Sequence, residues 1–218
     1  MKFGYCALLS GLALFSGCGA KTPPTPSPSI PEATVSARPA PAAVATATPA
    51  GSPGFDKQLE LNGIGFHVRS PNVAAGNTVD VAPAGLEIDN SPFTSDADGA
   101  VTGAEVADLD ADGSPEIYVF VTSTDATARG SVVAFSANKR KSLSSIYLPP
   151  MAETPAAAQG YQGHDDFAVV EGSLVRRFPI YAGEGVGAAP TGKTRQLQYK
   201  LVPGEAGWIL KLDRTTDF

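Results

Sequence analysis

Two runs of β-branched and aromatic residues in the middle of the chain, residues 117–121 and 132–135, constrain the fold most strongly. An acidic segment, residues 108–116, precedes the first run, and a polar connection from Thr122 to Gly130 separates the two. Such runs are typical of β-strands, and this connection is too long for a two-residue hairpin turn. We therefore expect two strands with the connection projecting from the sheet, where binding residues are often found.

Short segments with the same strand character recur along the chain, separated by glycine, proline, asparagine or aspartate. Many short strands separated by turn-forming residues predict an all-β fold, here an antiparallel β-sandwich or barrel of about eight or more strands. The further segments are residues 64–69, 78–81, 86–89, 101–107, 143–148, 167–170, 174–181, 195–202 and 208–212.

The sequence predicts two hairpins and one helix in detail. Glu171-Gly172 forms a two-residue turn in which the glycine supplies positive φ, and residues 196–202 and 208–212 alternate apolar and polar side chains as one hairpin with a core-facing side. At most one short helix is expected, with Thr154 as its N-cap, Pro155 in its first turn and Gly160 as its end.

The N-terminus has the pattern of an export signal. Lys2 precedes an apolar run, residues 3–14, that is shorter than the roughly 20 residues needed to span a bilayer. The run ends in Phe-Ser-Gly-Cys18, which resembles a bacterial lipobox, so we expect residues 1–18 to be a lipoprotein signal peptide and Cys18 to be lipidated. Gly19 favours the periplasmic face of the outer membrane; the alternative, an ordinary secretory signal, would leave a soluble periplasmic protein.

Residues 19–54 are rich in proline, alanine and threonine and have almost no large apolar side chains. Such a segment cannot bury enough surface to offset its chain entropy, so we expect a disordered tether with a reach on the order of 100 Å. Cys6 and Cys18 are the chain's two cysteines, and Cys6 leaves with the signal. The folded domain, residues 55–218, must therefore be stabilised by its core alone.

The predicted domain is acidic. Only Glu32 among the 22 acidic residues lies outside it, as do Lys2, Lys21 and Arg38 among the 16 basic residues, which leaves the domain a net charge of −8. This charge argues against nucleic acid and anionic lipid as partners of the domain. It favours a cationic protein that is attracted electrostatically.

The acidic segment has the spacing of a calcium loop. Asp108, Asp110 and Asp112 alternate before Gly113, and Glu116 offers a further carboxylate. An EF-hand would need a glutamate where Val119 stands, and it would need flanking helices. We therefore leave two interpretations open: a calcium site in a β-hairpin, or a turn closed on its own backbone amides. No other cofactor is expected.

Two further motifs do not support enzymatic activity. His164 lies beside Asp165 and Asp166, but no activated nucleophile accompanies it, so we expect a structural histidine, with Arg176 and Arg177 as ion-pair partners of this acidic turn. Residues 187–194 match the nucleotide P-loop pattern, which functions only before a helix. Because a strand pattern follows, we interpret these residues as a flexible loop.

Three blocks of the sequence together resemble the periplasmic inhibitors of invertebrate-type (i-type) lysozyme. They are residues 108–121, with the core DGSPEIYV; residues 141–150, KSLSSIYLPP; and residues 160–208, with GYQGHDDFAVVEGSLVRRFPIY and TRQLQYKLVPGEAGW. The resemblance implies an antiparallel β-sandwich in the cell envelope and a non-enzymatic role, occlusion of the lysozyme cleft. It also leaves a homodimer open.

In that family the loop between the two central strands is a serine-glycine-serine-tyrosine run whose serine and tyrosine enter the cleft. Here the corresponding stretch is Ala-Thr127-Ala-Arg129 before Gly130, so neither side chain is present. Arg129 could instead pair with a carboxylate of the cleft, while Thr127 or Ser123 supplies a hydroxyl. The other interpretation is an exposed arginine on a mobile loop.

The sequence thus predicts an envelope lipoprotein that inhibits lysozyme, of the i-type by resemblance, by inserting residues 122–130 into the active-site cleft. Two other functions stay open. One is a calcium-stabilised binding or adhesion module of the envelope without inhibitory activity, and the other is a hydrolase that uses His164.

Overall fold

A computed structural model describes residues 53–183, 185, 187–205 and 207–218. The predicted signal peptide, Cys18 and nearly all of the tether lie outside the described residues. The all-β prediction is confirmed. The strands are β1 (Phe55–Leu61), β2 (Ile64–Ser70), β3 (Thr78–Ala84), β4 (Phe93–Asp96), β5 (Ala100–Ala107), β6 (Glu116–Thr122), β7 (Gly130–Ser136), β8 (Ser144–Tyr147), β9 (Asp166–Val170), β10 (Ser173–Tyr181), β11 (Pro190–Pro203) and β12 (Trp208–Asp217).

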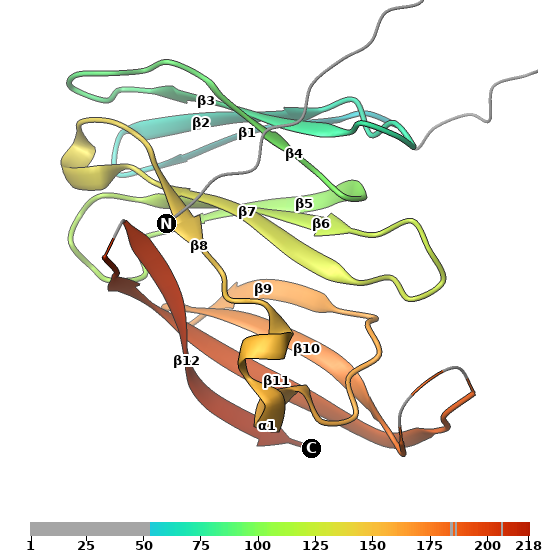
Figure 1. Ribbon diagram of the computed structural model, residues 1–218. Helices are drawn as coiled ribbons and strands as arrows, with labels where there is room; N and C mark the ends of the chain where they lie inside the picture. Colours follow the sequence, from blue (N-terminus) through green and yellow to red (C-terminus); the bar gives the residue numbers. More distant parts are fainter. Residues whose placement is uncertain (1–52, 184, 186, 206) are drawn as a thin grey trace, which may run out of the picture. The chain divides into compact units, whose positions relative to one another are not determined.

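The strands form two sheets (Figure 1). Strands β1 to β4 pair in chain order as an antiparallel sheet. The larger sheet has the order β5-β6-β7-β8-β12-β11-β10-β9 and is antiparallel except where β8 pairs with β12 in parallel, with Ile146 opposite Trp208. This one parallel pair joins the first four strands of the larger sheet to the last four.

The larger sheet is nearly closed into a barrel, because its two outer strands approach one another. The backbone amide of Val169 in β9 donates a hydrogen bond to the Glu105 carboxylate of β5, at 2.6 Å. A side chain thus takes the place of backbone pairing between the two edges. The bond satisfies one backbone donor on an edge strand that would otherwise be free.

Strand β6 separates two apolar cores. Ile117, Val119 and Val121 face the first core, which includes Ile64, Phe66 and Val81 from the four-stranded sheet. Tyr118 and Phe120 face the second core, inside the larger sheet, with residues of β10, β11 and β12. Both faces of β6 are therefore buried, which explains why its sequence is a continuous apolar run and lacks the alternation of a half-exposed strand.

Most of the expected strands are present, and both expected hairpins form, with Ser173 opposite Val170 and with β11 paired to β12. The expected helix is the single turn α1 (Pro155–Ala158), which Thr154 caps through its backbone carbonyl and not through its side chain. Short 3₁₀ turns lie at Asn138–Arg140 and Met151–Glu153.

Three details of the strand prediction were wrong. Strands β1 and β4 were missed, because most of their residues are charged or polar and too few are apolar to indicate a strand. Residues 86–89 are not a strand, since their amides bond to the carbonyls of Arg140 and Lys141 and to the Asn90 side chain. Strand β11 begins at Pro190, so the second half of the P-loop-like segment is already sheet and no helix follows it.

Candidate functional site

Residues 123–129 connect β6 to β7; together with the paired strand ends Thr122 and Gly130 they are hereafter the 122–130 loop, which is ordered by its own polar side chains. The Asp125 carboxylate accepts hydrogen bonds from the Ser123 hydroxyl at 3.1 Å and from the Thr127 amide at 2.8 Å, and the Thr127 hydroxyl donates to the same oxygen. The Ser123 hydroxyl in turn accepts from the Arg129 amide at 2.8 Å. The two hydroxyls predicted to contact a lysozyme thus fix the shape of the loop.

The segment between α1 and β9, hereafter the 160–165 segment, holds the loop from one side. The His164 amide donates to the Thr127 carbonyl at 2.8 Å, and the Gly130 amide donates to the Asp165 carboxylate at 2.7 Å. Gly163 lies so close that an added Cβ would be 2.1 Å from the Thr127 carbonyl oxygen, and its φ is +97°. Only glycine permits this contact without displacing the loop.

Asp165 is the centre of a buried polar network. Its carboxylate forms a 2.6 Å ion pair with the Arg176 guanidinium, and the two side chains are 0% and 5% exposed. The Tyr161 hydroxyl donates to Asp165 at 2.6 Å and accepts from Arg176 at 2.8 Å. Burial and the bond to Asp165 raise the pKa of Tyr161 to about 12, so this hydroxyl keeps its proton. The predicted ion pair between Arg176 and the acidic turn is confirmed, whereas the one predicted for Arg177 is wrong, because its guanidinium donates to the Gln196 side chain on β11 at 2.7 Å.

Arg129 is the exposed cation of the 122–130 loop. Its guanidinium carbon lies 5.9 Å from the centre of the Tyr161 ring, whose other neighbour is Arg176 at 4.9 Å. The Arg129 guanidinium forms no hydrogen bond or ion pair with any described residue. It borders two surface hollows, one of which also includes Met151 and Pro150 and the other Gln162 and Gly183. Arg129 therefore lies on an ordered loop, and none of the described residues neutralises its charge.

The predicted calcium loop lies between β5 and β6. Asp108, Asp110 and Glu116 each offer a carboxylate oxygen within 4.8 Å of the others. Among the described residues, these three form the one cluster of side chains that could together bind a metal ion. Asp112 is not part of this group, and its carboxylate accepts the Ser114 amide at 2.7 Å. The Asp108 carboxylate also accepts the amides of Asp112 and Gly113, as expected for a turn that closes on its own backbone.

Glu116 differs from the other carboxylates in this group because it is 1% exposed. It accepts a hydrogen bond from the Leu109 amide at 2.8 Å and a long one, 3.5 Å, from the Ser136 hydroxyl. Burial, with the nearby charges of the aspartates, raises the pKa of Glu116 to about 8. Burial of this side chain could not be read from an acidic segment of the sequence.

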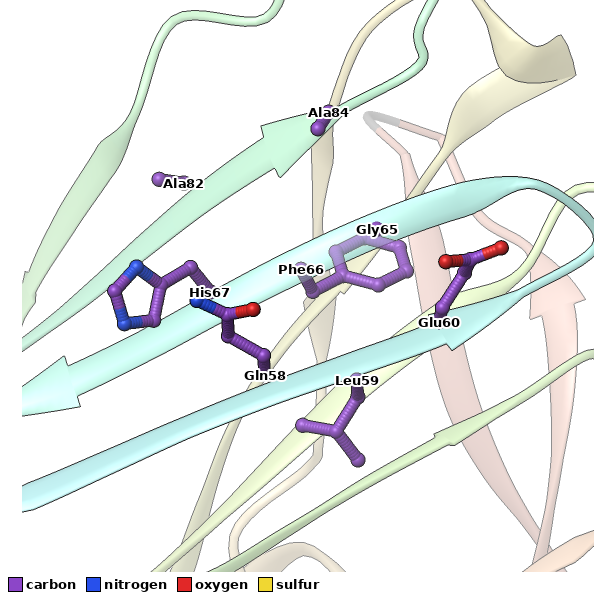
Figure 2. A pocket seen from close by; sticks show the side chains of 8 residues that line it. All are labelled: Gln58, Leu59, Glu60, Gly65, Phe66, His67, Ala82 and Ala84. Atoms are coloured by element: carbon purple, nitrogen blue, oxygen red, sulfur yellow. The ribbon is translucent and has the colours of Figure 1, made fainter.

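The two histidines lie apart from any such group. The His67 ring is 2.8 Å from the Asp56 carboxylate, and His164 is exposed, with its ring beside Tyr181. Figure 2 shows the hollow over β1, β2 and β3 where His67 lies beside Gln58, with Glu60 further along the hairpin. Neither ring belongs to a three-residue metal-ligating group in the part of the chain that the structure describes.

Comparison with family models, with curated proteins and with solved structures finds no match to this chain. Within the described residues, no helix has the length and apolar character needed to cross a lipid bilayer.

The structure brings Ser123, Thr127, Arg129 and Gly130 together in one loop and places the acidic group at the other end of β6. Sequence reasoning missed the support of this loop by Tyr161, Gly163 and Asp165. The only signal was the run Gly163-His-Asp165, which we interpreted as a structural histidine in an acidic turn. In the structure the glycine and the aspartate contact the loop, while the histidine ring is exposed.

Proposed function

We propose that this protein is a lysozyme inhibitor, related to the periplasmic inhibitors of i-type lysozyme and anchored to the outer membrane through Cys18. The 122–130 loop would enter the active-site cleft of the enzyme, and the protein itself would perform no chemistry. The observation that carries the proposal is an ordered, exposed loop that presents Arg129, whose charge is paired with no residue that the structure describes.

The order of the loop supports such a role energetically. Internal bonds to Asp125 and external bonds to the 160–165 segment fix the loop before any partner arrives. A loop that is already in its bound shape loses little conformational entropy on binding, which is how protein inhibitors of hydrolases reach high affinity. A mobile loop with the same sequence would bind more weakly.

The charges are complementary to a lysozyme at two scales. A lysozyme cleft holds paired carboxylates, and a guanidinium can bind a carboxylate through two parallel hydrogen bonds. Over longer distances, the net charge of −8 on residues 55–218 would attract a cationic enzyme and raise the association rate at low salt. Arg129 would then be a local cation on an acidic domain.

The proposal is tested with full-length protein, purified in detergent, in a turbidity assay of cell-wall lysis by i-type, c-type and g-type lysozymes. We expect inhibition of at least the i-type enzyme. Full lysis by all three enzymes in the presence of a large excess of the protein would exclude the proposal, leaving the calcium-stabilised binding module as the alternative.

Replacing Arg129 with alanine should weaken inhibition by roughly 10- to 100-fold, as expected for a charged side chain at the centre of an interface. Arg214→Ala is the matched control, because Arg214 is an exposed arginine on β12, which pairs with β8 and β11 and not with the strands that carry the loop. Inhibition constants of the two variants decide the point. Equal constants would show that Arg129 makes no contact with the enzyme.

A further inference from the structure

Three carboxylates converge at the start of β6 without a compensating cation. Asp108 and Asp110 come from the β5–β6 connection and Glu116 is the first residue of β6. Like charges within 4.8 Å repel one another, and no ion pair with a described lysine or arginine involves any of the three. The nearby Arg140 guanidinium reaches only the carbonyls of Gly113 and Asn62.

A second feature beside these carboxylates is a buried hydroxyl without a partner. Tyr118 is fully buried, and its hydroxyl makes no hydrogen bond to any described residue. Tyr118 follows Glu116 by two positions on β6, so both side chains point into the larger sheet. Burial first, and then the charges of Glu116, Asp110 and Asp108, raise the pKa of Tyr118. Buried hydroxyls nearly always have a hydrogen-bond partner, and no described residue supplies one to Tyr118.

A hydrated cation bound between the carboxylates accounts for both features. Its positive charge would offset the repulsion among the carboxylates, and a water molecule in its shell can bond to the Tyr118 hydroxyl. The available ligand atoms are all oxygens, which excludes the nitrogen and sulfur environment that zinc prefers. Calcium accepts six to eight oxygens in irregular geometry, whereas magnesium needs a near-ideal octahedron. Calcium therefore fits this turn better than magnesium does, because the shape of the turn is set by bonds to its own backbone amides and not by an octahedral arrangement of ligands.

We propose that Asp108, Asp110 and Glu116 bind one calcium ion and that Tyr118 hydrogen-bonds to a water molecule of that ion. This site would tie the β5–β6 turn to the interior of the larger sheet and so stabilise the fold. The proposal is independent of lysozyme inhibition, because the site lies at the end of β6 opposite the 122–130 loop.

The test is calorimetric titration of the EDTA-treated full-length protein with calcium chloride, together with thermal unfolding with and without calcium. We expect heat of binding at a one-to-one ratio and a rise of several degrees in the melting temperature at saturation. Magnesium chloride at the same concentration should give a smaller rise. Absence of binding heat and of any thermal shift would overturn the proposal, as would a magnesium effect equal to that of calcium.

Two variants locate the ion. Asp110→Asn should weaken calcium binding by about tenfold or more and leave the turn intact, because the Asp110 side chain makes only a 3.4 Å bond to the Asp112 amide. Asp98→Asn, at an exposed aspartate outside the group, is the control and should bind calcium as the native protein does. Tyr118→Phe should reduce the calcium-induced shift while raising the melting temperature in EDTA. Unchanged calcium binding by Asp110→Asn would place the ion elsewhere and refute the site.

Discussion

Replacing Asp165 with asparagine is expected to lower the free energy of unfolding by roughly 3–5 kcal/mol. The Arg176 side chain is 5% exposed and its ion-pair partner is the Asp165 carboxylate, so the substitution leaves a buried guanidinium without its counter-charge. The Tyr161 hydroxyl and the Gly130 amide lose the same charged acceptor. Urea unfolding followed by the fluorescence of Trp208 measures the effect.

The control for Asp165 is Asp213→Asn. Asp213 forms an ion pair with Lys200 at 3.1 Å, but both side chains are substantially exposed, at 37% and 60%. A solvated pair of this kind contributes about 1 kcal/mol or less. A loss of stability in Asp165→Asn no larger than in Asp213→Asn would mean that the buried network does not stabilise the domain.

Replacing Gly163 with alanine is expected to destabilise the domain by roughly 2–5 kcal/mol and to detach the 122–130 loop. A left-handed backbone costs an alanine about 1–2 kcal/mol, and overpacking adds about 1–3 kcal/mol. The overpacking arises because the new Cβ would lie 2.1 Å from the Thr127 carbonyl oxygen. Urea unfolding gives the energy, and amide hydrogen exchange should show faster exchange at His164, whose amide bonds to Thr127.

Gly172→Ala separates the two contributions. Gly172 also has a left-handed backbone, with φ +70°, but nothing lies within 4 Å of an added Cβ. This variant should lose only the conformational part, about 1–2 kcal/mol, and should keep the loop protected from exchange. If Gly163→Ala and Gly172→Ala were equally stable and equally protected, the contact between the 160–165 segment and the loop would have no energetic role. Because the proposed inhibition depends on that contact, Gly163→Ala should also inhibit lysozyme less.

The loop itself was predictable, but its support was not. Local composition marks residues 117–121 and 132–135 as strands, and the polar residues between them as a projecting loop. Nothing in the sequence around Gly130 shows that its amide bonds to Asp165, 35 residues later in the chain. The ion pair between Arg176 and the acidic turn was foreseen, because opposite charges on neighbouring segments pair readily. Its burial beneath Tyr161 was not.

For the group of Asp108, Asp110 and Glu116 as well, the local pattern was predictable and the tertiary contacts were not. The alternating aspartates and Glu116 can be read from the sequence as a turn or an ion site, since the spacing is local. The sequence did not reveal that Glu116 is buried, that Asp112 lies outside the group, or that no described residue bonds to the Tyr118 hydroxyl. These facts depend on which strands cover β6, and that is a long-range property.

The sequence by itself determined the all-β class, most of the strands and the β-hairpins, because alternation, β-branched residues and turn residues act over a few neighbouring positions. Only the tertiary structure decided that β8 joins β12 in parallel, that Glu105 bridges the outer strands of the larger sheet, and that the 160–165 segment supports the 122–130 loop. Each of these contacts joins residues far apart in the chain. They form because whole faces of the sheets bury apolar surface together, and no short stretch of sequence contains that information.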